Sequence, residues 1–122
     1  MVLYNRKQKP FHWTAHSKDK MRFYRLSESR VKRVLHSPKR IEEGIAPDTI
    51  AVMQPASLKS KIENGKRKEI WTQEIWVMIE ETPKQRNVIS VWRYPGATKP
   101  RSEIALDFLR SEYEEFSVLN LK

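Results

Sequence analysis

The hydrophobic pattern of this chain changes its period at Pro38, and this change limits the folds open to it. Before Pro38 the apolar residues recur at helical spacing, and after it they alternate as they do in strands. A proline also restricts the residue before it to extended backbone, so a helix is expected to end there. The sequence therefore predicts helices first and an antiparallel sheet afterwards, the order of an α+β fold.

Capping residues predict where the helices begin. Thr14 is expected to cap a helix running to about Tyr24, because its hydroxyl can accept from a free backbone N–H of the first turn. Ser27 is expected to cap a second helix that ends before Pro38. A third, amphipathic helix is predicted from about Ser102 onward, with acids on its outer faces.

The chain between the second and third helices predicts an antiparallel meander. The polar, lysine-rich segment Pro55–Lys68 contains Asn64-Gly65, and we interpret it as a long hairpin loop or a mobile flap. The expected strands are Arg40–Ile45, Thr49–Gln54, Glu69–Glu81 and Val88–Tyr94.

Both faces of this predicted sheet carry apolar side chains. In the last strand, strict alternation puts Ile89, Val91 and Arg93 on one face and Val88, Ser90, Trp92 and Tyr94 on the other. An antiparallel sheet usually leaves one face wet, so both faces here need a cover. We expect the first two helices to cover one face and the C-terminal helix the other, with a partner in a homodimer as the alternative cover.

The predicted architecture is thus two N-terminal helices packed on a four-stranded antiparallel sheet, plus a C-terminal helix. Its parts are a basic lead-in over 1–10, an α+β domain over 11–101 and an acidic amphipathic helix over 102–122. The length of 122 residues fits one domain. The chain has no cysteine, and we see neither a signal peptide nor a membrane span, so we expect a cytoplasmic protein without membrane contact.

The formal net charge of +9 is unevenly placed along the chain. Residues 1–40 hold twelve Lys/Arg against two acids, and residues 82–101 hold five against none. A surplus concentrated in two segments suggests a field focused on one polyanionic partner, and RNA is the partner we expect. The alternative is a solvated surface that happens to be basic.

Several chemistries are disfavoured by the residues present. No histidine forms a metal-ligand pattern at helical spacing with another histidine or an acid, because the first helix is expected to start between His12 and His16, and no thiolate is available. The three glycines form no phosphate-binding loop, and no serine stands in a nucleophile-elbow motif. We therefore expect neither a metal nor a cofactor.

What remains is a basic constellation that could act on a phosphodiester. Cleavage of RNA by its own 2′-hydroxyl needs a base, an acid and cations around the phosphorane, and no metal. His, Arg, Lys and Tyr can supply these groups. The candidates for nucleic-acid binding are Lys18, Lys20, Arg25, Arg30, Arg33, Lys99 and Arg101.

Each candidate also has a structural alternative. For His16 the alternative is a purely local hydrogen bond, and the tryptophans are better suited to a core than to base stacking. Arg93 shares its predicted face with core residues, so it needs a partner, either Glu74 or Glu80 or a bound phosphate. The acids that could pair with Arg22 and Arg25 are Glu42 and Glu43.

Five short motifs resemble a bacterial and archaeal domain family of unknown function related to the BrnT-like toxins. The family is grouped with the RelE/ParE-like ribonuclease toxins. The motifs are Trp13–His16, Lys20–Arg22, Leu26–Val31, Val34–Pro38 and Val88–Tyr94. The resemblance covers roughly residues 11–101 and leaves out the C-terminal helix, and the insertion Leu58–Lys68 departs from the pattern.

The resemblance implies metal-independent RNA cleavage, neutralised by an acidic antitoxin. By this resemblance, His16 would act as general base or acid, and Arg22 and Arg93 would hold the phosphate. Tyr94 would orient the substrate. Family membership does not establish catalysis, so two other hypotheses stand beside a toxin-like endoribonuclease. They are a non-catalytic RNA- or ribosome-binding module and a protein-interaction subunit.

Overall fold

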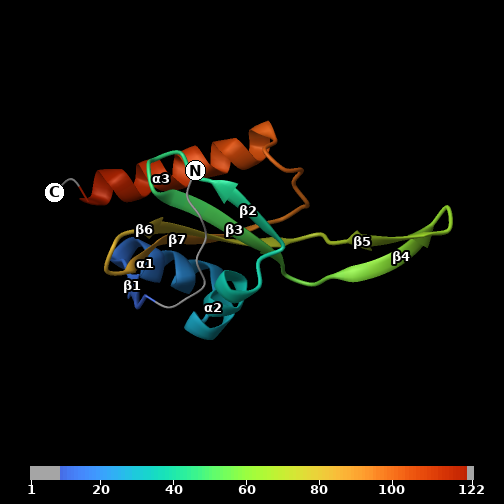
Figure 1. Cartoon of the computed structure of the whole chain (residues 1–122), viewed down its shortest axis with the longest axis horizontal. Helices are drawn as coiled ribbons and strands as arrows, with labels where there is room; N and C mark the ends of the chain where they lie inside the picture. Colours follow the sequence, from blue (N-terminus) through green and yellow to red (C-terminus); the bar gives the residue numbers. More distant parts are fainter. Residues whose placement is uncertain (1–8, 121–122) are drawn as a thin grey trace.

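The computed structural model describes residues 9–120, arranged as a layered body from which a thin two-stranded ribbon projects (Figure 1). The helices are α1 (Ala15–Tyr24), α2 (Glu28–His36) and α3 (Glu103–Asn120). The strands of the body are β1 (Phe11–Trp13), β2 (Arg40–Glu43), β3 (Thr49–Pro55), β6 (Glu74–Glu81) and β7 (Arg86–Tyr94). The ribbon consists of β4 (Lys59–Glu63) and β5 (Lys66–Ile70), and we call residues 59–70 the arm.

The predicted helix caps are confirmed. The Thr14 hydroxyl accepts from the backbone N–H of Ser17 at 3.1 Å, and the Ser27 hydroxyl accepts from that of Arg30 at 3.1 Å. Each bond satisfies one of the N–H groups that a helix leaves free at its start. α2 ends two residues before Pro38, as the restriction on pre-proline backbone requires.

The body sheet has the strand order β1-β7-β6-β3-β2, and its central strands are antiparallel. The prediction of one four-stranded antiparallel sheet is wrong in two respects. β1 adds a fifth strand, which pairs with β7 in parallel. A parallel neighbour needs a crossover, and the chain from α1 to β6 supplies it because it lies between β1 and β7 in sequence.

Both faces of the body sheet are covered, as predicted. α1 and α2 pack on one face and α3 on the other (Figure 1). Under α1 and α2 lie the side chains of Val52, Ile75, Val77, Val88 and Val91, with Val31, Val34 and Leu35 from α2. Under α3 lie those of Met53, Trp76, Met78, Ile89 and Trp92, with Leu109 and Phe116 from α3.

Two side chains of β7, those of Val88 and Ile89, lie on the faces opposite to those predicted. Ile89 packs under α3, whereas Val91 packs under α1 and α2. The register between β6 and β7 shifts at Met78/Ile79, which leaves an extra residue in β7. A bulge of this kind breaks the alternation of faces that the sequence analysis assumed.

We interpreted the segment Pro55–Lys68 as a long hairpin loop or a mobile flap. Most of it instead belongs to the regular hairpin of the arm. Asn64 and Gly65 form its turn, both with positive φ (52° and 76°), a conformation that Asn and Gly adopt at low cost. The single strand predicted over Glu69–Glu81 is divided in two. The residues between β5 and β6 leave the ladder there, and the Trp71 indole turns to donate to Glu74.

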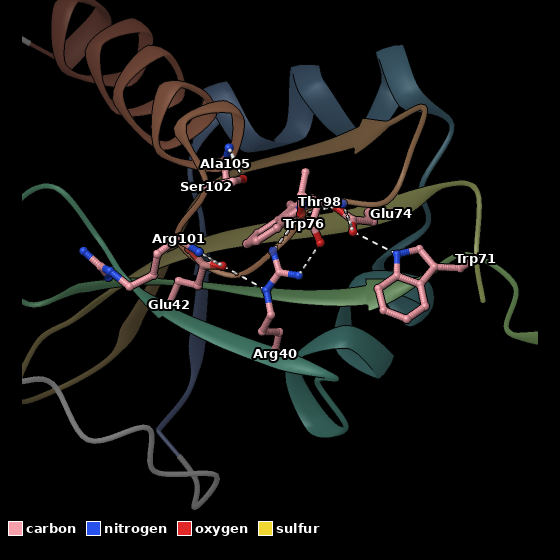
Figure 2. Close-up of polar contacts among 9 residues, drawn as sticks. All are labelled: Arg40, Glu42, Trp71, Glu74, Trp76, Thr98, Arg101, Ser102 and Ala105. Carbon is pink, nitrogen blue, oxygen red and sulfur yellow. Dashed lines mark hydrogen bonds and ion pairs between the residues drawn. The ribbon is translucent and has the colours of Figure 1, made fainter. Parts of the chain in front are cut away.

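A buried carboxylate fixes the beginning of β6 (Figure 2). The Glu74 carboxylate accepts from the indoles of Trp71 and Trp76 at 2.8 and 2.9 Å. It also accepts from the backbone N–H and the hydroxyl of Thr98, both at 2.8 Å. Arg40 donates to the Thr98 carbonyl at 2.9 Å, so the chain between β7 and α3 is bound to the sheet from both sides.

Most of the predicted lead-in, 1–10, lies outside the described residues. Of the remainder, Lys9 donates to Glu81 at 3.0 Å, and the Pro10 carbonyl accepts from the Arg86 N–H. Within residues 9–120, no helix combines the length and the apolar character that crossing a bilayer requires.

Candidate nucleic-acid interface

Arg93, predicted to face a core and to need a partner, is held by two neutral oxygens. Its Nε donates to the backbone carbonyl of Tyr24 at 2.8 Å, and one terminal nitrogen donates to the Gln73 side chain at 3.1 Å. The first bond caps the C-terminus of α1, where carbonyls lack helical partners. Neither Glu74 nor Glu80 is the partner of Arg93, so its charge is not neutralised by the acids considered in the sequence analysis.

Arg30 is held in the same manner. Its guanidinium donates to the side-chain oxygen of Gln54 and to the carbonyl of Pro55, at the end of β3. Burial lowers the pKa of the Arg30 guanidinium, and the positive charges of Arg33 and Arg93 lower it further. The charges of Arg33 and Arg93 therefore disfavour the protonated form of Arg30, and an anion bound between the three side chains would favour it.

Arg30, Arg33 and Arg93 thus form what we call the arginine cluster. Within residues 9–120, no carboxylate forms an ion pair with any of the three. The cluster lies at the root of the arm, because its partners Gln54 and Gln73 stand just before and just after it in the chain. Guanidinium groups that are already held in position, and that are not paired with a carboxylate, are suited to bind a phosphate.

The arm adds more positive charge next to this cluster. Residues 59–70 hold five Lys/Arg and two Glu, and every one of them is exposed. Residues paired across an antiparallel ladder share a face, and two of these pairs are Lys61 with Lys68 and Glu63 with Lys66. One face of the arm, which we call the lysine face, therefore carries Lys59, Lys61, Lys66 and Lys68 with Glu63 and Ile70.

A shallow depression between α1 and the start of α2 gathers three other predicted residues. Lys18, Arg22 and Arg25 line it, together with Glu28 and two apolar side chains. Arg22 is ion-paired with Asp19 and 72% of its side chain is exposed. Neither Glu42 nor Glu43 is the partner of Arg22 or Arg25, so the pairing considered from the sequence is wrong.

His16 and Lys20 lie in the contact between α1 and α3. His16 is only 6% exposed, and its Nε2 lies 3.9 Å from Glu112 Oε1 without a hydrogen bond. The Glu112 carboxylate accepts instead from Lys20 at 3.0 Å and from the Ser90 hydroxyl. A phosphodiester on the surface cannot approach an imidazole buried in this way without displacing α3.

The four residues predicted to cut RNA are not brought together. Arg93 binds Tyr24 at the last turn of α1, whereas His16 stands in the first turn, eight residues or roughly 12 Å away along the axis. The Tyr94 ring packs on Phe108 of α3, with centroids 4.7 Å apart, on the opposite side of the sheet from Arg93. The geometry thus separates the predicted base from the predicted phosphate holder.

Two further predicted residues, Lys99 and Arg101, lie in the segment that leads into α3. Both are exposed, and the Arg101 N–H lies 3.4 Å from the Glu42 carboxylate that it faces (Figure 2). No candidate was predicted within the arm. The Asn64-Gly65 pair is the hairpin-turn signal that could have identified it.

No three potential ligands among His, Asp and Glu gather into a metal site within residues 9–120. Comparison of the chain with protein-family models, with curated proteins and with solved structures finds no match. The resemblance to BrnT-related toxins therefore stays a prediction, and function has to be argued from the geometry above.

Proposed function

We propose that this protein is a non-catalytic module that binds nucleic acid through its backbone phosphates. The observation that carries the proposal is the arginine cluster: neutral acceptors hold the guanidinium groups of Arg30 and Arg93, Arg33 is exposed beside them, and none of the three is ion-paired with a described carboxylate. A guanidinium can donate two parallel hydrogen bonds to a phosphate, so such a site is prepared for this ligand.

The distribution of charge over the fold supports the same proposal. Residues 15–36, which form α1 and α2, hold seven Lys/Arg and two acids, a surplus of five cations. Residues 103–120, which form α3, hold one Arg and five acids, a surplus of four anions. The two covers of the sheet thus have opposite charge. A polyanion would be attracted to the side of α1 and α2 and repelled by α3.

The endoribonuclease hypothesis receives less support from this geometry. The burial of His16, its distance from Arg93 and the packing of Tyr94 on α3 keep the predicted general base and the predicted orienting residue away from the arginine cluster. Binding of a nucleic acid, unlike its cleavage, does not require His16 or Tyr94 to take up or release a proton. The predicted RNA partner is kept as one of the ligands to test.

The experiment is a binding titration with labelled RNA and DNA oligonucleotides over a range of salt concentrations. Arg33→Gln and Arg110→Gln form a matched pair, since each removes one exposed helical arginine, from α2 and from α3. We expect Arg33→Gln to reduce the slope of log affinity against log salt by about 0.7 to 0.9, the loss of one phosphate contact. Arg110→Gln is expected to leave the slope unchanged.

Two outcomes would contradict the proposal. Affinity that does not fall with salt would exclude binding through phosphates, and equal effects of Arg33→Gln and Arg110→Gln would exclude the arginine cluster as the site. Incubation of the RNA in EDTA tests catalysis in the same samples. Cutting that His16→Ala abolishes would restore the endoribonuclease hypothesis.

A further inference from the structure

The arm has no role in the hydrophobic core. All its residues are exposed, and no described helix covers either of its faces (Figure 1). A two-stranded hairpin without such cover is only marginally stable in water. At its root Glu69 is ion-paired with Lys39, an exposed contact of the kind that contributes little.

The lysine face makes the isolated arm weaker still. Lys61 and Lys68 lie directly opposite each other, and like charges in that position destabilise a ladder. Glu63 lies 3.6 and 4.0 Å from these two ammonium groups and offsets part of the repulsion. Folding alone does not explain four lysines on one face, and a polyanion against that face would.

The exposed side chains discriminate between kinds of nucleic acid. Proteins that bind single strands without sequence preference stack the bases on aromatic rings. The arm has no aromatic residue, and among the large hydrophobic side chains exposed within residues 9–120 the one aromatic is Phe23 of α1. A surface rich in cations and poor in stacking rings favours a duplex, whose bases stay stacked on one another.

The dimensions of the arm discriminate between kinds of duplex. Two paired strands lie about 4.7–4.9 Å apart, and five residues extend about 17 Å. The major groove of B-form DNA is about 12 Å wide and admits a two-stranded ribbon. The major groove of A-form RNA is too deep and narrow for side chains to read.

We propose that the arm lies in the major groove of a B-form DNA duplex with its lysine face turned into the groove, while the arginine cluster holds a backbone phosphate of the same duplex. This inference rests on the proposed function and names its ligand class. Lysines 59, 61, 66 and 68 would contact acceptors on the base edges and phosphates along the groove. On the other face, Ser60, Ile62 and Arg67 point to solvent and Glu69 is ion-paired with Lys39.

The test compares one sequence prepared as duplex DNA, duplex RNA and single-stranded DNA. Lys68→Gln and Arg67→Gln form the matched pair, because these neighbours in β5 are both exposed, each carries one charge and they point to opposite faces. We expect Lys68→Gln to weaken binding to duplex DNA by roughly tenfold and Arg67→Gln to leave it within about twofold. Wild-type protein should bind duplex DNA at least about tenfold more tightly than the other two ligands.

Because the arm lies outside the core, we expect both variants to keep the wild-type thermal midpoint. NMR contacts between β4 and β5 in each variant would show that the arm stays folded. Equal losses for Lys68→Gln and Arg67→Gln, or equally tight binding of duplex RNA or of single strands, would overturn the inference. If Arg33→Gln still weakens binding in that case, the proposed function survives without the arm. If none of the three ligands binds, both proposals fail together.

Discussion

The molecule contains two sheets that differ in how far their residues are buried. The body sheet is covered by helices on both faces, and its central strands are almost entirely buried. The arm is covered on neither face, and all ten of its strand residues are exposed. Burial thus accounts for the residues of the first sheet and for none of those of the second, and this contrast is the basis of our proposal that the arm contacts DNA.

The largest expected difference between the two sheets concerns buried and exposed carboxylates. Glu74→Ala removes the acceptor for four donors in the body, whereas Glu63→Ala removes an exposed carboxylate in the arm. Since each buried donor left unsatisfied costs about 1–3 kcal/mol, we expect Glu74→Ala to lower the free energy of unfolding by at least about 3 kcal/mol. Glu63→Ala should stay within about 0.5 kcal/mol.

Urea denaturation of the two variants measures this difference. Similar free energies of unfolding for Glu74→Ala and Glu63→Ala would contradict the view that the body alone determines stability.

A second pair compares apolar side chains. Leu109 of α3 is fully buried, whereas Ile62 of β4 is 76% exposed. We expect Leu109→Ala to destabilise the protein by about 2–5 kcal/mol through lost burial and the cavity left behind, and Ile62→Ala to have almost no effect. Thermal unfolding measures both, and a midpoint for Ile62→Ala as low as that for Leu109→Ala would show that the arm contributes to the core.

The smallest difference concerns two glycines in turns. A Cβ on Gly44 would lie 2.7 Å from the Thr49 carbonyl oxygen, so Gly44→Ala forces the turn between β2 and β3 to shift, at a cost of about 1–3 kcal/mol. Gly65 has open space but a φ of 76°, so Gly65→Ala strains only the turn of the arm.

We therefore expect Gly44→Ala to lower the thermal midpoint of the whole protein. Gly65→Ala should leave that midpoint unchanged and speed amide exchange in residues 59–70. Faster exchange throughout the body of Gly65→Ala would show that the two sheets are coupled.

The body was largely predictable because local and periodic signals agree there. The Thr14 and Ser27 caps lie where the sequence indicated, and Pro38 follows the end of α2. The bulge that places Ile89 under α3 was not predictable, because no glycine or break in the pattern announces it. The parallel strand β1 was absent from the predicted sheet, because three residues do not reveal which strand they pair with.

The arm and the site were harder to predict for a physical reason. A ribbon without a buried face carries no hydrophobic alternation, so the turn of Asn64-Gly65 was its one clear signal. The charge surplus of α1 and α2 was visible in the sequence, but the position of Arg93 was not. Its partners are a main-chain carbonyl and an amide, Tyr24 and Gln73, which only the tertiary structure brings near.

The most direct test of the central claim is an NMR titration of the full chain with a short DNA duplex, in which each amide reports its own contact. We expect the largest shift changes in residues 59–70 and around Arg30, Arg33 and Arg93. Amides of α3 should change least, because that helix is acidic and lies on the opposite face of the sheet. Changes concentrated in α3, with the arm unaffected, would show that the arm and the arginine cluster are not the binding surface.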